Sequence, residues 1–149
     1  MDYLLFFVAF IWLMVYLQNE EEEPGTDEVH LYYYRNDADF NDWRIWIWNI
    51  DSASYGQSIE AELVEPNRFR ARYRIPLGNV GNIGILPYRD GWKDKDGPDK
   101  LLNNTNNKAR GQRLYLVEGE PDLRTTKPVI QPPLKNAFLD SKNSIQIQF

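Results

Sequence analysis

The residues with the clearest capacity for recognition chemistry are two tryptophans, Trp46 and Trp48, in the segment WRIWIWNI at positions 43–50. Alternate side chains of a β-strand share one face. The set predicted to face a core is Trp43, Ile45 and Ile47; the set predicted to face solvent is Arg44, Trp46 and Trp48. At about 3.3 Å per residue, the two indoles would lie ~6.5–7 Å apart on the surface.

Two indoles at this separation suit the binding of a sugar polymer. The apolar C–H face of a pyranose can lie on an indole ring, while its hydroxyls reach polar groups nearby. The spacing allows neighbouring indoles to hold neighbouring glucose units of a curved α-1,4 chain. Exposed tryptophans are usually kept for a ligand or a partner. The alternative interpretations are that another segment covers the pair, or that a protein docks on it.

Catalytic and metal-binding chemistry have little support in the composition. The chain has no Cys, and His30 is its only His, so it has no thiolate metal site and no His cluster. It contains no nucleotide-binding glycine motif and no H-E-x-x-H motif. The sequence therefore predicts no catalytic residue, no metal and no cofactor.

The charge of the chain is unevenly distributed. Seven of the 22 acids lie in residues 1–30, which hold no Lys or Arg, so the remaining 15 acids face 17 bases. A nearly neutral domain argues against nucleic acid as the ligand. Segment 68–75, RFRARYRI, places Arg68, Arg70, Arg72 and Arg74 on one face. We interpret this face as solvated and paired with Glu60 and Glu62, rather than as a nucleic-acid patch.

The N-terminal region predicts membrane targeting. Residues 3–17 are fifteen consecutive apolar or aromatic residues, fewer than the ~20 that span a bilayer comfortably. We interpret residues 1–17 as a signal or membrane anchor rather than as a buried element of the domain, which places the chain outside the cell, secreted or on the cell surface. Residues 18–28, QNEEEEPGTDE, are predicted to be an acidic linker.

The rest of the chain predicts an all-β fold. Short segments rich in β-branched and aromatic residues predict strands at 29–34, 43–50, 59–64, 68–75, 80–87 and 112–118. Segment 88–111 is predicted to be a long polar loop, a kind of segment that often carries function. Six short strands and no helical periodicity after residue 28 favour a single antiparallel, immunoglobulin-like β-sandwich at 29–124. We expect the chain to be a monomer. Residues 125–135 are predicted to be a Pro-rich linker. Residues 136–149 are predicted to be the first strand of a following, truncated β-domain.

Three motifs resemble one known family. YYRNDADFNDWRIWIW at 33–48 resembles the Tyr-x-Arg-x-Asp-x-x-Tyr/Phe-x-x-Trp-x-Leu/Ile-Trp-x-Trp opening of the pullulanase-associated domain, carbohydrate-binding module family 41. GILPYRDGWKDKDGPDKLL at 84–102 is similar to the family's strand and the charged loop that follows it. RLYLVEGEPDL at 113–123 is similar to its closing strand and turn. The resemblance covers residues 29–124.

The resemblance implies a set of binding residues. The family binds sugar with two Trp, a Lys and an Asp, and Trp46 and Trp48 match the Trp pair directly. Asp99 matches the Asp, although Lys100 stands where the family has Arg.

The Lys of this set has two candidates, because the loop differs in spacing by about one residue. Lys95 is favoured, since Lys95-Asp96 repeats the family's Lys-Asp step nearest to Asp99, and Lys93 is the alternative. Trp92 either adds a further wall to the site or belongs to the core.

The resemblance further implies a non-catalytic module that binds α-glucans such as pullulan, amylose or starch, and glycogen, and that targets a pullulanase-type enzyme to its polymer. Two alternatives remain open from the sequence. One is a membrane-anchored protein-interaction module that uses the Trp face. The other is a glycoside hydrolase, which needs a pair of carboxylates across a cleft, and no recognisable motif supplies such a pair.

Overall fold

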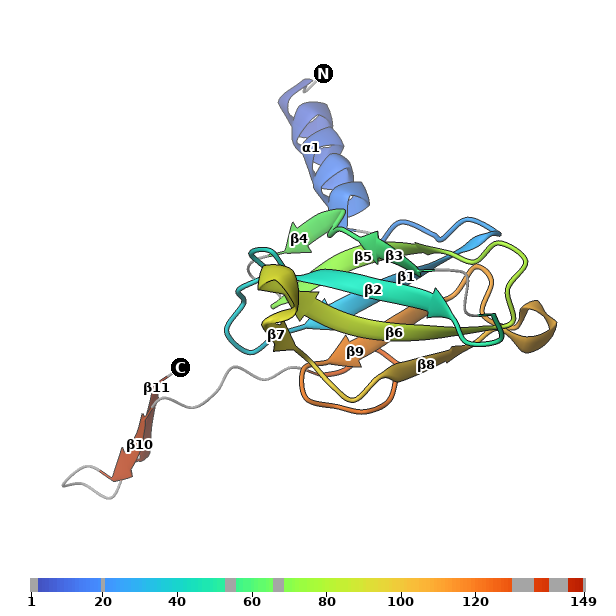
Figure 1. Cartoon of the computed structure of the whole chain (residues 1–149). Helices are drawn as coiled ribbons and strands as arrows, with labels where there is room; N and C mark the ends of the chain where they lie inside the picture. Colours follow the sequence, from blue (N-terminus) through green and yellow to red (C-terminus); the bar gives the residue numbers. More distant parts are fainter. Residues whose placement is uncertain are drawn as a thin grey trace.

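The computed structural model describes residues 3–19, 21–52, 56–65, 69–129, 136–139 and 145–148. Two β-sheets pack against each other as a β-sandwich, which confirms the predicted fold class (Figure 1). Sheet 1 has the order β4 (Leu63–Glu65), β5 (Arg70–Pro76), β1 (Glu28–Tyr34), β9 (Arg113–Val117). Sheet 2 has the order β3 (Gly56–Ile59), β2 (Arg44–Asn49), β6 (Asn82–Arg89), β7 (Asp94–Lys95), and β8 (Lys100–Asn103) also pairs with β6. Among the described strand pairs, only β1 with β9 is parallel.

The core lies between the two sheets and follows from the two-residue period of the strands. On β1, Leu31 and Tyr33 face inward with no exposed surface, and Ile45 and Ile47 do the same from β2. They belong to one buried apolar cluster with residues of β5, β6, β8 and β9. Complete burial of a side chain of this size contributes about 1.5–3 kcal/mol, so the alternating pattern both fixes the faces and supplies the stability that holds β2 in place.

One predicted strand, 59–64, is wrong. Ile59 ends β3, which pairs with β2 in sheet 2, whereas Leu63 begins β4, which pairs with β5 in sheet 1. The chain therefore changes sheets between them, as strands do at the corners of sandwiches. The pairing of β4 with β5 confirms the predicted hairpin; its turn at Pro66 and Asn67 lies outside the described residues.

The segment 88–111, predicted to be a long loop, contains regular structure. It holds the one-turn helices η2 (Asp90–Trp92) and η3 (Thr105–Asn107) and the short strands β7 and β8. In β8, Lys100 and Leu102 are buried, and Leu101 is exposed. A lysine at a core position hides the apolar alternation, which explains why the sequence pattern did not reveal this strand.

The arginine face of β5 is not solvated as predicted. Arg70 is 1% exposed and Arg72 is 9% exposed, while Arg74 is 39% exposed. Arg68 lies outside the described residues. Glu62 pairs with Arg72 and Arg74, as predicted, whereas Glu60 pairs with Arg44 instead.

The burial of these arginines comes from acids outside the predicted sandwich. Glu21 lies 2.7 Å from the Arg70 guanidinium, and Glu22 lies 3.3 Å from that of Arg72. Glu23 pairs with Arg113 of β9 at 2.9 Å. We call residues 21–23 the acidic strap. Because the strap neutralises the arginines, the alternative of a nucleic-acid patch loses its support.

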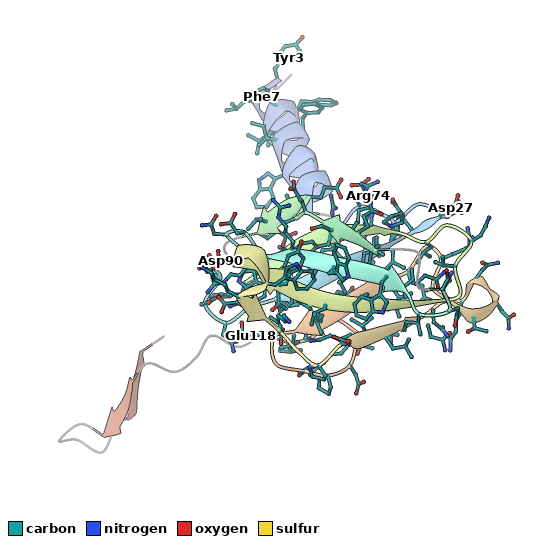
Figure 2. The ribbon with its side chains drawn as sticks, viewed as in Figure 1. Tyr3, Phe7, Asp27, Arg74, Asp90 and Glu118 are labelled. Atoms are coloured by element: carbon teal, nitrogen blue, oxygen red, sulfur yellow. The ribbon has the colours of Figure 1, made fainter. Side chains whose placement is uncertain are left out.

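The apolar N-terminal segment forms α1 (Tyr3–Asn19), which stands outside the two sheets (Figure 1). Figure 2 shows Tyr3 and Phe7 on this helix, away from the sandwich, and the two side chains are 78% and 62% exposed. Residues 3–12 are therefore exposed and are not a buried element of the domain. Among the described residues, no helix combines the length and the apolarity needed to cross a membrane.

The C-terminal segment contains two strands where one was predicted. β10 (Asn136–Leu139) and β11 (Ile145–Gln148) pair with each other in an antiparallel ladder. Residues 130–135, in the predicted Pro-rich linker, lie outside the described residues. That residues 136–149 begin a following domain stays a prediction.

Candidate functional site

Strand β2 presents two chemically different faces, as its alternation predicts. Trp43, Ile45 and Ile47 are 5%, 0% and 0% exposed and belong to the core. Trp46 and Trp48 project from the opposite side and are half-buried. We call this opposite side of sheet 2 the outer face. The two indoles are thus supported by the sheet and still accessible from solvent.

Two glycines on the neighbouring strands allow the indoles to lie close to the sheet. A β-carbon placed on Gly84 of β6 would come within 2.1 Å of the Trp48 ring, and one on Gly56 of β3 within 2.4 Å of the Trp46 ring. Real β-carbons do not approach other atoms so closely, so no larger residue fits there without a shift. Glycine within a strand often marks such a close approach. The sequence signal was present in the glycine-punctuated segment 80–87, but its meaning was missed.

The strand register places the charged candidates on the same face. Residues directly opposite each other in paired strands share a face, and Tyr88 of β6 pairs with both Arg44 of β2 and Lys95 of β7. Lys95 is therefore on the outer face, where its ammonium nitrogen lies 5.7 Å from the centroid of the Trp92 ring.

Asp99 directly precedes β8. Its neighbour Lys100 pairs with Ile85, so continuing this register by one residue brings Asp99 opposite Leu86, the residue that pairs with Trp46. Its side chain is exposed. Lys93, the alternative to Lys95, is also exposed, but it follows η2 and precedes β7, and no described pairing fixes it beside the indoles.

Trp92 is part of the surface rather than of the core. Its side chain is 40% exposed. One ring face stacks on Tyr88 at a centroid distance of 4.0 Å and an interplanar angle of 9°. The ring stands at 75° to that of Trp46, at 5.5 Å. Trp92 thus forms a wall beside Trp46, and Tyr88, which sequence reasoning missed, supports it from below.

Two other charges of the same loop are structural. Asp96 accepts hydrogen bonds from the Tyr33 hydroxyl at 2.8 Å and from the backbone N–H of Gly119 at 3.0 Å. Lys100 is 1% exposed and donates to the backbone carbonyl of Asp96. Burial lowers the pKa of the Lys100 ammonium. These two groups tie the loop to the sandwich and leave Lys93, Lys95 and Asp99 as its exposed candidates.

The first motif of the sequence builds the support of β2. The Arg35 guanidinium carbon lies 4.1 Å from the centroid of the buried Trp43 ring. Arg35 also donates to the Tyr33 hydroxyl at 3.1 Å and to Asp37 at 3.0 Å. Phe40 packs edge-on against Tyr33 at 6.3 Å. These motif residues are scaffold, whereas Trp46 and Trp48 of the motif reach the outer face together with Arg44.

The chemistry available at this face is recognition. Three indoles supply apolar ring surface, and Lys95 and Asp99 supply a donor and an acceptor at its edge. In the described part of the chain, no three His, Cys, Asp or Glu side chains come together in a way that could hold a metal ion.

Comparison with known proteins identifies the family and the fold of the domain. A family model described as "Bacterial pullanase-associated domain" matches residues 27–125. A solved structure of family 41 carbohydrate-binding modules from streptococcal virulence factors, which recognise α-glucans, has a TM-score of 0.51 at 13% identity, covering 70% of this chain and 50% of that chain.

Two further structures show the same fold. One is a streptococcal virulence factor that binds α-glucan, with a TM-score of 0.50 and 17% identity, covering 70% of this chain and 49% of that chain. The other is a multi-modular glycogen-degrading pneumococcal virulence factor, SpuA, with a TM-score of 0.50 and 16% identity, covering 70% of this chain and 11% of that chain. The matched region thus spans about half the length of the first two and a small part of the third.

Proposed function

This chain belongs to the bacterial pullulanase-associated domain family, non-catalytic carbohydrate-binding modules of family 41, and from that premise we propose that its outer face binds α-glucans. The observation that carries the proposal is the pair of half-buried indoles, Trp46 and Trp48, beside the exposed Lys95 and Asp99. Because this family consists of non-catalytic modules, the alternative of a glycoside hydrolase is no longer supported.

The two kinds of group have separate tasks. The Trp46 and Trp48 rings receive the C–H faces of consecutive glucose units, a contact that buries apolar surface on both partners. Lys95 donates to sugar hydroxyls and Asp99 accepts from them, in hydrogen bonds strengthened by the charge. Because few groups touch a hydrated polymer, we expect micromolar affinity, of order −8 kcal/mol.

The substrate polymers we propose are pullulan, amylose or starch, and glycogen. The module would hold such a polymer near an associated pullulanase-type enzyme and so raise its local concentration. This role places the chain outside the cell, secreted or on the cell surface. The apolar α1 would attach it to a membrane, and the module would act as a monomer.

Affinity electrophoresis tests the proposal directly. We expect migration of the full chain to be retarded in gels that contain amylopectin or pullulan, and the Trp46→Ala/Trp48→Ala variant to migrate as in a plain gel. Trp12→Ala is the matched control, because Trp12 is 72% exposed on α1 and its loss should leave the retardation intact. Absence of retardation would refute glucan binding and favour the protein-interaction module. Retardation that survives the double substitution would refute the assignment of the binding surface to Trp46 and Trp48.

A further inference from the structure

A pocket of about 340 Å³ lies at the end of sheet 2 where β2 begins and β6 ends. Asp90, labelled in Figure 2, marks this end of the sandwich. The residues that line the pocket are Asp42, Arg44, Tyr88, Arg89, Asp90, Gly91 and Trp92. Its volume is within the range of small-ligand sites. None of its polar residues was among the binding candidates suggested by the sequence.

The pocket continues the line of the Trp pair. Arg44, Trp46 and Trp48 succeed one another on the same face of β2, each about 6.6 Å from the next. Trp92 borders the pocket and also contacts Trp46, with 5.5 Å between the ring centroids. A chain of glucose units lying on Trp48 and then on Trp46 would therefore reach the pocket with its next unit.

The backbone around the pocket is held in an uncommon conformation. Asp42, Asp90 and Trp92 have φ values of 59°, 52° and 76°, a region that non-glycine residues rarely occupy. For a side chain as bulky as Trp92 this is a clear outlier. Such strain persists where the surroundings over-determine it, often at ligand sites. Here the stack on Tyr88 and the edge contact with Trp46 hold the Trp92 ring as a wall.

Two polar groups of the pocket, Asp42 and Arg44, are available to a ligand. The Asp42 carboxylate is exposed and has no hydrogen-bond or ion-pair partner among the described residues. Arg44 pairs with Glu60 at 3.0 Å, but both side chains are well exposed, at 45% and 71%. An exposed ion pair of this kind is weak, so a sugar hydroxyl can compete for the guanidinium.

We propose that this pocket is a further sugar subsite, which receives the glucose unit that follows the two on Trp46 and Trp48. Trp92 is its side wall, and Asp42 and Arg44 bind hydroxyls of the incoming unit. The inference rests on the proposed function and adds to it a dependence on chain length. A glucan long enough to fill the pocket binds more tightly than one that covers the Trp pair alone.

Titration calorimetry of the full chain with maltose and with maltotetraose tests the subsite. We expect wild type to bind maltotetraose at least about tenfold more tightly than maltose, equivalent to ~1.4 kcal/mol. The Asp42→Ala/Arg44→Ala variant should bind maltose like wild type and lose most of the gain for maltotetraose. The control variant, Lys108→Ala/Asp122→Ala, removes exposed charges of the same two signs outside the pocket and should behave like wild type.

Trp92→Ala gives a second measurement, since removing the wall should also reduce the gain from chain length. Equal losses for both sugars in the Asp42→Ala/Arg44→Ala variant, or no gain with length in wild type, would overturn the subsite while glucan binding itself stands. No binding of either sugar or of amylopectin would overturn both proposals. Thermal unfolding of each variant confirms that the comparison is made between folded proteins.

Discussion

Trp48 lies against Gly84 so closely that a β-carbon on the glycine would come within 2.1 Å and 2.2 Å of two atoms of the indole. The two residues are directly paired across β2 and β6. The absence of a side chain at position 84 therefore sets how close the ring can lie to the sheet and which surface it presents to a ligand. Gly56 of β3 comes similarly close to the Trp46 ring, although its direct partner in the strand register is Trp48.

Gly84→Ala should weaken glucan binding by displacing Trp48. We expect about a tenfold loss of affinity for maltoheptaose, ~1.4 kcal/mol, measured by titration calorimetry. If Gly84 acts through Trp48, the Gly84→Ala/Trp48→Ala variant should bind no more weakly than Trp48→Ala alone, because neighbouring residues that share one role are not additive.

A matched glycine separates this effect from a general loss of structure. A β-carbon on Gly25 would meet only the flexible Glu28 side chain, at 3.3 Å or more, so Gly25→Ala should retain full affinity. Additive losses from Gly84→Ala and Trp48→Ala would show that the glycine does not act by positioning the indole.

Lys95 and Lys93 should differ in their effect on binding. The pairing of Lys95 with Tyr88 fixes it on the outer face beside Trp92, whereas no described pairing fixes Lys93. Lys95→Ala should therefore lower the affinity for maltoheptaose about tenfold, in line with the loss of one charged hydrogen bond. Lys93→Ala removes the same charge two positions away and should have an effect below about twofold. A larger loss from Lys93→Ala would reverse the assignment.

The sequence predicted the faces of β2 because the two-residue period of a strand is a local property. Trp43, Ile45 and Ile47 are buried, and Trp46 and Trp48 are accessible, from alternation alone. The support beneath the indoles could not be read in this way. Gly56 and Gly84 matter only through the register of three strands, which no single segment encodes.

Sequence reasoning failed where a distant segment decides the environment. The arginines of β5 alternate as on a solvated face, yet Arg70 is buried because Glu21, 49 positions earlier, folds onto it. For a similar reason the sequence left open whether Trp92 is a wall of the site or part of the core. Its exposure depends on Tyr88 of β6 and Trp46 of β2. Such contacts are set by packing rather than by local pattern.

The acidic strap should contribute measurably to stability. Glu21 accepts a hydrogen bond from the buried Arg70 at 2.7 Å and one from Lys127 at 3.2 Å. Burial raises the pKa of the Glu21 carboxyl, but these hydrogen bonds lower it by more, so its pKa is below the ordinary value. Glu21→Gln should lower the free energy of unfolding by about 1–3 kcal/mol, since it weakens a buried charged hydrogen bond. Urea denaturation at pH 7 measures the change.

The pH and a control variant make this prediction specific. A depressed carboxyl pKa supplies stability above the unfolded-state value near 4.5, and that stability is lost as the pH falls through the folded-state pKa. The difference in the free energy of unfolding between wild type and Glu21→Gln should therefore become smaller below pH 4. Glu60→Gln alters only an exposed pair with Arg44 and should change stability by less than about 1 kcal/mol. An equal effect from the two substitutions would mean that the strap is not anchored by Glu21.

Alkaline pH should destabilise the sandwich through its buried tyrosines. Burial raises the pKa of five tyrosine hydroxyls above the ordinary value of 10.0: Tyr32, Tyr33, Tyr34, Tyr73 and Tyr115. Above pH 10 the unfolded chain releases these protons and the folded chain retains them, so stability falls as the pH rises. Each such group contributes a slope of about 1.4 kcal/mol per pH unit. Lys100, whose pKa is lowered by burial, acts in the opposite direction below pH 10.5.

Tyr73 offers a direct test of this slope. Its hydroxyl donates to the backbone carbonyl of Trp43 at 2.9 Å, so Tyr73→Phe should cost about 1–3 kcal/mol at pH 8, where it leaves that buried carbonyl without its donor. The variant also lacks a hydroxyl that, at high pH, ionises in the unfolded chain but stays protonated in the folded chain, a difference that favours unfolding. Its stability should therefore decline less steeply than that of wild type, and the two curves should converge between about pH 11 and 12. Urea denaturation from pH 8 to 11.5 measures both slopes, and parallel curves would show that Tyr73 does not ionise differently in the folded and unfolded states.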